Sequence, residues 1–130
     1  MTRALVIDDD LTVRAVVGRT LRRAGYETLE APDAGAGLHL LAAQSFDLAI
    51  VDIFMPGQGG LTTIAQIRER WPSVKVLAMS AADRLEMAAH AQAVGADAFL
   101  KKPFEAQTLL STIDALLEAP PPPPPSKGSP

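Results

Sequence analysis

The feature that most constrains the fold is a repeated alternation of short apolar runs with stretches of helical periodicity. Four runs are almost entirely apolar, which is typical of strands buried on both faces of a parallel sheet. They cover residues 4–7, 48–51, 74–78 and 98–100. A fifth segment, residues 27–30, alternates polar and apolar side chains and is expected to form an edge strand.

Segments with helical spacing of their apolar residues fill the intervals between these runs. The predicted helices cover residues 13–24, 33–44, 61–70, 82–94 and 105–118. Gly25 and the Trp71-Pro72 pair are stop signals after the first and third helices. Gly35 and Gly37 weaken the second, since each costs about 1 kcal/mol relative to alanine. Five strand–helix repeats predict an α/β fold with a parallel sheet, right-handed crossovers and helices on both faces.

Length and composition allow one domain of ordinary size. With 130 residues, 48% of them hydrophobic, the chain can bury one core, and we expect that domain to cover residues 1–118. The net charge is −3 and no dense basic cluster is present, so direct binding of nucleic acid is not expected. The absence of cysteine excludes disulfides and thiolate metal sites.

The first apolar run is too short to be the core of a signal peptide or a membrane span. We therefore expect a soluble, cytoplasmic protein that does not bind membranes.

Residues 119–130 differ in composition from the rest of the chain. They include six consecutive prolines, residues 120–125, which favour an extended polyproline II conformation. We interpret this segment as a disordered tail or linker; a ligand for an aromatic groove is the less favoured alternative. Whether an output domain follows is left open, and a stand-alone domain is our preferred interpretation.

Polar residues end or follow four of the predicted strands. They are Asp8, Asp9 and Asp10, then Asp52, then Ser80, then Lys101 and Lys102. In an open α/β sheet these carboxyl ends form the crevice where ligands bind. Each residue also has an ordinary explanation: a helix cap for Asp10 or Ser80, a turn for Asp52 and a solvated charge for Lys102. Their conjunction favours a site, because gathered carboxylates repel unless cations offset them.

The residue types at this edge match the needs of phosphoryl transfer. That reaction uses a nucleophilic oxygen, a divalent cation and fixed positive or hydrogen-bonding groups around the phosphoryl oxygens. A carboxylate set favours Mg²⁺. The two histidines, His39 and His90, fall in the middle of predicted helices and are interpreted as surface or packing residues.

Four segments of the chain resemble the signature segments of response-regulator receiver domains of two-component signalling, such as the chemotaxis receiver protein. They are LVIDDD (residues 5–10), DLAIVDIFMPG (47–57), VLAMSA (76–81) and GADAFLKKPF (95–104). They occur in the order and at the spacing of that family. The resemblance implies a five-stranded parallel sheet of order 2-1-3-4-5 in a flavodoxin-like receiver fold.

The resemblance also implies roles for individual residues. Asp52 corresponds to the phosphoacceptor, Asp9 to a direct metal ligand and Asp8 to a ligand that acts mostly through water, with Mg²⁺ as the cofactor. Asp52 itself and the backbone carbonyl of Phe54 would complete the metal contacts. Lys102 corresponds to the ammonium that pairs with the phosphoryl group, and its bond to Pro103 is expected to be cis.

Two further positions correspond to the conformational switch of the family. Ser80 matches the hydroxyl that moves toward the phosphoryl group, and Phe99 matches the aromatic ring that turns into the space left behind. The alternative for Phe99 is a plain core aromatic. The switch would change partner binding through the surface made by the fourth helix, fifth strand and fifth helix.

By this resemblance the chain is a signalling phosphoprotein rather than an enzyme with turnover, with only self-catalysed phosphoryl acceptance and slow autodephosphorylation. The expected partners are a sensor histidine kinase or phosphotransfer protein and a downstream protein target. Ala98 stands where family members that dimerise through the fourth and fifth helices tend to carry aspartate, and the last helix lacks arginine and lysine. We therefore expect a monomer.

Other departures concern the loop after Asp52. Residues 58–60 read Gln-Gly-Gly, where the family usually has a hydrophobic residue, then Asp or Asn, then Gly. This substitution predicts a more mobile loop. The bulky ring of Phe54 is expected to hinder attack by water on a phosphorylated Asp52.

Three alternatives remain at the level of sequence. Residues 8–12 also fit the Asp-x-Asp-x-Thr nucleophile motif of haloacid-dehalogenase-type phosphatases, which would make Asp8 the nucleophile, but only Glu105 could serve as an acid soon after Lys102. A flavodoxin-like cofactor binder is disfavoured because no phosphate-binding loop follows the first strand. A receiver that binds its partner without phosphorylation is disfavoured by the complete site.

Overall fold

The computed structural model describes residues 2–55, 57–81 and 85–118. Five strands form one parallel sheet of order β2-β1-β3-β4-β5, which confirms the predicted fold class. The strands are β1 (Arg3–Ile7), β2 (Glu27–Ala31), β3 (Leu48–Asp52), β4 (Lys75–Ser80) and β5 (Ala98–Lys101). The helices are α1 (Leu11–Arg23), α2 (Ala34–Ala43), α3 (Gly60–Arg70), α4 (Leu85–Ala93) and α5 (Ala106–Glu118).

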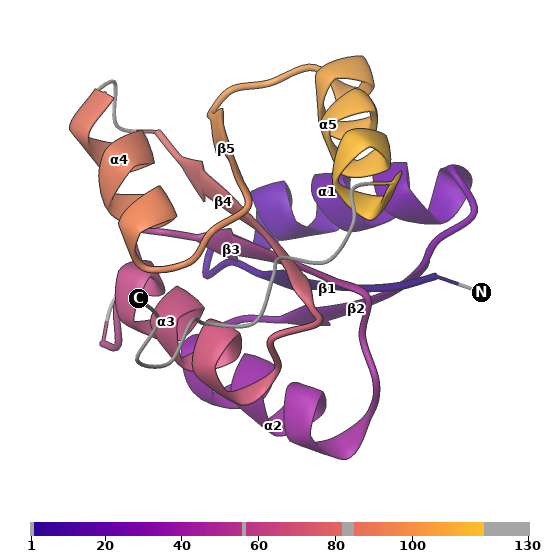
Figure 1. Cartoon of the computed structure of the whole chain (residues 1–130). Coiled ribbons are helices and arrows are strands. Elements are labelled where there is room, and N and C mark those ends of the chain that lie inside the picture. The colour runs from indigo at the N-terminus through magenta and orange to yellow at the C-terminus, as the bar shows by residue number, and fades with distance from the viewer. Residues whose placement is uncertain (1, 56, 82–84, 119–130) are drawn as a thin grey trace.

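The helices cover both faces of the sheet (Figure 1). On one face, α1 and α5 pack over a core that includes Val6, Ile50 and Leu77. On the other face, α2, α3 and α4 pack over a second core that includes Ile7, Val51 and Val76. Because neighbouring residues of a strand point to opposite faces, β1, β3 and β4 supply both cores, which explains their continuous apolar sequences.

Helix α1 begins at Leu11, after the three aspartates that follow β1. The Asp10 carboxylate accepts hydrogen bonds from the backbone N–H groups of Thr12 and Val13, at 2.9 and 3.2 Å. Asp10 therefore is the helix cap that its position in the sequence allowed.

Helix α2 forms despite its two glycines. A Cβ atom on Gly37 would lie 2.4 Å from the Cδ1 atom of Ile7. The missing side chain thus lets α2 approach β1 closely, and packing offsets the low helix propensity of this residue. Gly35, by contrast, is exposed.

Some boundaries differ from the predicted ones. Helix α1 begins at Leu11, two residues before the predicted start at residue 13. Strand β4 continues past the apolar run of residues 74–78 to Ser80, the polar residue expected at its end, and Met79 and Ser80 pair with β5. The predicted start of the fourth helix at residue 82 and the segment 119–130 lie outside the described residues. None of the helices within the described part is long and apolar enough to cross a membrane.

Candidate functional site

The candidate site is at the carboxyl edge of the sheet. In the ladders, Ile7 pairs with Val51, and Ser80 pairs with Lys101. The strand ends are therefore nearly level, and the residues that follow them share one edge. Four segments that are distant in the sequence meet there, as the sequence analysis predicts.

Three carboxylates form a cluster at this edge. Oxygen atoms of Asp8, Asp9 and Asp52 all lie within 4.8 Å of one another. Asp8 is fully buried and Asp52 is 5% exposed, whereas Asp9 is exposed. An all-oxygen set of this kind, open on one side, fits a hard divalent cation such as Mg²⁺, which keeps part of its water shell.

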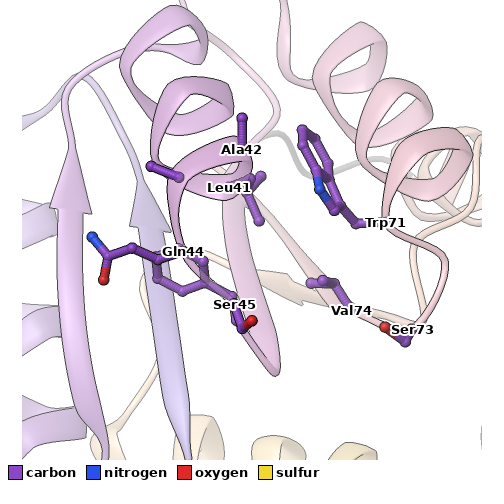
Figure 2. Close-up of a pocket in the computed structure, with 9 residues that line it drawn as sticks. Leu41, Ala42, Gln44, Ser45, Trp71, Ser73 and Val74 are labelled. Atoms are coloured by element: carbon purple, nitrogen blue, oxygen red, sulfur yellow. The ribbon is translucent and has the colours of Figure 1, made fainter.

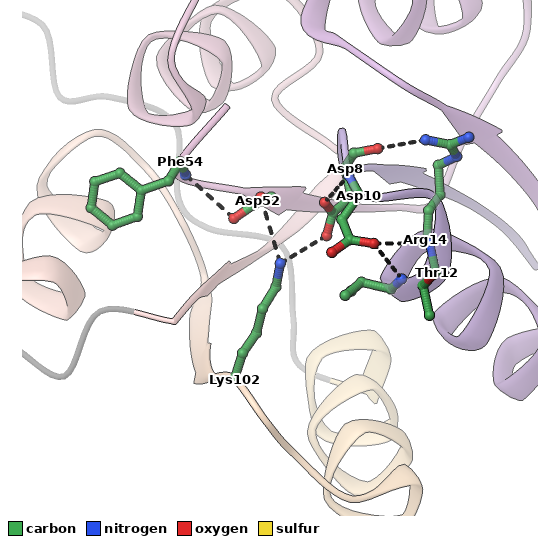
Figure 3. Close-up of polar contacts among 8 residues, drawn as sticks. Asp8, Asp10, Thr12, Arg14, Asp52, Phe54 and Lys102 are labelled. Carbon is green, nitrogen blue, oxygen red and sulfur yellow. Dashed lines mark hydrogen bonds and ion pairs between the residues drawn. The ribbon is translucent and has the colours of Figure 1, made fainter. Parts of the chain in front are cut away.

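Lys102 supplies the positive charge of the cluster. Its Nζ atom lies 2.9 Å from Asp8 Oδ2 and 3.5 Å from Asp52 Oδ2 (Figure 3). The Lys102–Pro103 peptide bond is cis, as expected. Lys101 is still part of β5 and pairs with Ser80 in the ladder, so Lys102 is the lysine that contacts the carboxylates.

The environment of Asp52 raises its pKa from 3.8 to about 6. Burial is the largest cause, and the negative charge of Asp8 is the second. The Lys102 ammonium and the N–H of Phe54 act in the opposite direction, since both stabilise the ionised carboxylate. At neutral pH Asp52 is therefore mostly ionised and able to act as a nucleophile.

Phe54 contributes its backbone to the site, and its side chain lies elsewhere. The N–H of Phe54 donates a hydrogen bond of 3.3 Å to Asp52 Oδ1. Phe54 is 55% exposed, and Figure 3 shows its ring directed away from Asp8 and Lys102. In this conformation the ring does not cover the acidic cluster, so the expected hindrance of water requires it to turn.

The two predicted switch residues lie on neighbouring strands. Ser80 is fully buried at the end of β4, and its carbonyl accepts a hydrogen bond of 2.8 Å from the N–H of Lys102. Phe99 is partly buried and packs against the core beneath α2, α3 and α4. Their positions suit a switch, and both the switch role and the plain packing role of Phe99 stay predictions.

The loop after Asp52 approaches the site closely. A Cβ atom on Gly60 would lie 2.1 Å from the carbonyl oxygen of Asp52, so only glycine fits there. Gly59, at the start of α3, provides no side-chain cap. The Gln58 amide instead donates to Thr63 and Gln66, at 3.1 and 2.8 Å. These bonds tie the loop to α3, and the predicted mobility of the loop stays a prediction.

Arg14 also lies at this edge, although it is not among the site residues predicted from the sequence. Its guanidinium donates a hydrogen bond of 2.8 Å to the backbone carbonyl of Asp8. The side chain is only 14% exposed, and its Nε atom lies 3.5 Å from a carboxylate oxygen of Glu30. The sequence could have indicated this position, because Arg14 falls in the first turn of the helix that follows the aspartates.

A separate pocket lies at the opposite edge of the sheet, between the loops that precede β3 and β4. Figure 2 shows Trp71 on one side of it and Leu41 and Ala42 on the other. Its nine lining residues include no charged side chain. The acidic cluster is therefore the better candidate for chemistry.

Comparison with known proteins identifies relatives with the same architecture. Residues 4–114 match the family model of the response regulator receiver domain. The chain is similar to the response regulator protein FleR of Pseudomonas aeruginosa, with 37% identity over 111 residues. It is also similar to the response regulator MprA of Mycolicibacterium vanbaalenii, with 35% identity over 115 residues.

These alignments cover 85% and 88% of this chain, but only 24% of FleR and 50% of MprA. Among solved structures, chemotaxis protein CheY4 of Vibrio cholerae superposes with a TM-score of 0.84 and 31% identity, over 89% of this chain and 98% of CheY4. The receiver domain of NtrX from Brucella abortus gives a TM-score of 0.86 and 31% identity, over 90% of this chain and 99% of that domain.

Proposed function

This chain belongs to the response regulator receiver domain family of two-component systems. We propose that Asp52 accepts a phosphoryl group from a phosphohistidine donor in a Mg²⁺-dependent reaction. One observation carries the proposal. The buried Asp52 carboxylate lies within 4.8 Å of two other carboxylates and 3.5 Å from the Lys102 ammonium. This arrangement combines a nucleophile, an oxygen-rich cation site and a fixed counter-charge.

The chemistry follows from these groups. An ionised oxygen of Asp52 forms a bond to phosphorus while the bond from phosphorus to the donor imidazole nitrogen breaks. The electron pair of that bond stays on the imidazole, and an acyl phosphate forms on Asp52. Lys102, released in part from Asp52, pairs with the new phosphoryl oxygens.

The metal ligands would be Asp8, Asp9, Asp52 and the backbone carbonyl of Phe54. Mg²⁺ bound there would neutralise charge on the phosphoryl oxygens and on the gathered carboxylates. The donor set supports this assignment, since all three side chains are carboxylates and no histidine of the described residues belongs to the cluster.

The proposed product is the protein phosphorylated on Asp52, and no compound made from a substrate is released. We therefore assign no turnover to this chain beyond self-catalysed phosphorylation and slow autodephosphorylation. Ser80 and Phe99 are the proposed switch residues. Movement of Ser80 toward the phosphoryl group would let the Phe99 ring turn inward and alter the surface of α4, β5 and α5. That surface is the proposed contact for a downstream protein target.

A phosphodonor must bring its histidine to Asp52 over the open side of the site. An apolar pocket lies beside Lys102, lined by Val13, Val16, Pro103 and Phe104 among others. Val16 and Leu11 are exposed on the same helix. We propose that a sensor histidine kinase or a phosphotransfer protein of the cytoplasm contacts this surface.

We propose that the domain acts as a monomer without direct contact to nucleic acid. Relatives that are named DNA-binding regulators, such as NtrC of Azospirillum brasilense, extend well beyond the matched region, since this chain covers 24% of that protein. Within the described residues, α5 carries no basic side chain that could pair with a second copy.

The test is incubation with a small phosphodonor and Mg²⁺, followed by measurement of the intact mass. The wild-type protein should gain one phosphoryl group that survives acid and is lost in base, as acyl phosphates are. Asp52→Asn should gain none, and a chelator should suppress the wild-type reaction. A stable adduct on Asp52→Asn, or no adduct on either protein, would refute the proposal.

A further inference from the structure

Asp9 has the least side-chain support of the three clustered acids. Asp8 accepts hydrogen bonds from Lys102 and from the N–H of Asp10, both at 2.9 Å. Asp52 is held by Lys102 and Phe54. Among the described residues, none donates a hydrogen bond to the Asp9 carboxylate, which is exposed. Its position therefore depends on the backbone that carries it.

Arg14 holds that backbone. The carbonyl to which it donates, at 2.8 Å, belongs to the peptide group that joins Asp8 to Asp9. Figure 3 shows the Arg14 guanidinium on the far side of Asp8 from Lys102. Because a peptide group is planar, fixing the direction of this carbonyl also fixes the position of the Asp9 Cα atom, from which the side chain extends.

Arg14 is held in turn by Glu30 of strand β2. One carboxylate oxygen of Glu30 lies 3.5 Å from Arg14 Nε, and the other lies 3.0 Å from Arg22 Nη1. Gly18 occurs between these arginines, four residues from each, so all three share one face of α1. A Cβ atom on Gly18 would lie 2.6 Å from Glu30 Oε2. The missing side chain leaves the space in which the Glu30 carboxylate bridges the arginines.

We propose that Arg14 is a positioning residue for the divalent cation. Its hydrogen bond to the Asp8–Asp9 peptide group holds Asp9 at the cluster. Glu30, which packs against Gly18, keeps Arg14 in place. This inference rests on the proposed function. The charge of Arg14 cannot explain a favourable effect, because a nearby cation repels a metal ion. The positioning effect of Arg14 should raise the affinity for the metal ion and its charge should lower it, so an experiment can separate the two effects.

The experiment is calorimetric titration of the protein with Mg²⁺. Arg14→Met should weaken binding by about tenfold, the size typical for loss of a group that orients a metal ligand. Gly18→Ala should also weaken binding by several-fold without any change of charge, since it displaces the Glu30 carboxylate. The matched control is Arg19→Met, which removes an exposed charge from the same helix; its affinity should be unchanged or slightly higher.

Unchanged or tighter Mg²⁺ binding by Arg14→Met, together with unchanged binding by Gly18→Ala, would overturn the inference and leave charge as the only role of Arg14. Circular dichroism verifies folding of each variant, and Gly18→Ala keeps the test decisive if Arg14→Met does not fold. Failure of the proposed function gives a different result: wild type itself would then bind no Mg²⁺ or gain no phosphoryl group on Asp52.

Discussion

The ammonium of Lys102 lies between the carboxylates of Asp8 and Asp52, 2.9 Å from the first and 3.5 Å from the second. One positive charge thus serves two neighbouring acids, of which Asp8 is fully buried. The cluster therefore keeps an excess of negative charge until a cation binds. This excess is a cost to the stability of the fold that a bound divalent cation would relieve.

The first prediction concerns that cost. Asp52 has a pKa of about 6 in the folded protein and 3.8 as its ordinary value, so its contribution to stability is present below pH 4 and is lost as the pH rises through 6. Asp52→Asn does not titrate. Without divalent cations it should be more stable than wild type at pH 7.5, by about 1–2 kcal/mol after allowance for solvent screening.

Urea denaturation at several pH values in the presence of a chelator measures this difference. The advantage of Asp52→Asn should shrink toward zero as the pH falls below 3.8, where wild-type Asp52 becomes protonated in both states. An advantage that does not change with pH would contradict the assigned cause.

The second prediction uses two neighbouring glycines at the start of α3. Gly60→Ala should lower stability by about 1–3 kcal/mol, because the new Cβ atom would overlap the carbonyl of Asp52. Gly59 has open space and an ordinary φ of −70°, and it lacks a side-chain cap. Gly59→Asn should therefore raise stability by a few tenths of a kcal/mol. Thermal denaturation of the two variants should show shifts of opposite sign.

The third prediction concerns Tyr26, the only tyrosine of the chain. Its hydroxyl donates a hydrogen bond of 2.8 Å to Asp114 of α5. Burial, followed by this bond and the charge of Asp114, raises the pKa of Tyr26 from 10.0 to about 12. The contribution to stability is thus present below pH 10 and is lost as the pH rises through 12.

Ultraviolet absorbance of the phenolate reports this pKa directly. Asp114→Asn should lower the pKa toward 10 but not reach it, since burial, the larger cause, remains. A pKa that is unchanged in Asp114→Asn would show that the link between α5 and the start of β2 is absent in solution.

The fourth prediction is the effect of Phe54 on the lifetime of the phosphorylated state. If the exposed ring turns toward phosphorylated Asp52, Phe54→Asn should speed dephosphorylation, because the smaller amide admits and orients water. Loss of the adduct after removal of the phosphodonor gives the rate. Equal rates would mean that the ring stays in the outward position of this structure.

Sequence reasoning predicted most of the fold because the strands of a doubly covered parallel sheet are marked by continuous apolar runs. Periodicity alone did not order the strands; that order came from the resemblance of four segments to a family. The apolar run of residues 74–78 marks only part of β4, because Met79 and the polar Ser80 continue its ladder with β5.

The candidate site was also largely predictable, because polar residues after apolar strands must meet at the carboxyl edge of the sheet. The support for Asp9 was not. It depends on a backbone carbonyl and on Glu30, whose meeting with Arg14 requires the register of β2 beside β1 and the docking of α1. Local patterns do not contain that information.

The most direct test of the account is to identify which carboxylate carries the phosphoryl group. After reaction with a phosphodonor and Mg²⁺, reduction of the acyl phosphate with borohydride and cleavage with trypsin separate the two candidate regions. Asp8, Asp9 and Asp10 fall in the peptide of residues 4–14, and Asp52 falls in residues 24–68. The account predicts that the reduced residue is Asp52 and that Asp52→Asn shows none. A reduced residue at Asp8, as the phosphatase alternative requires, would contradict it.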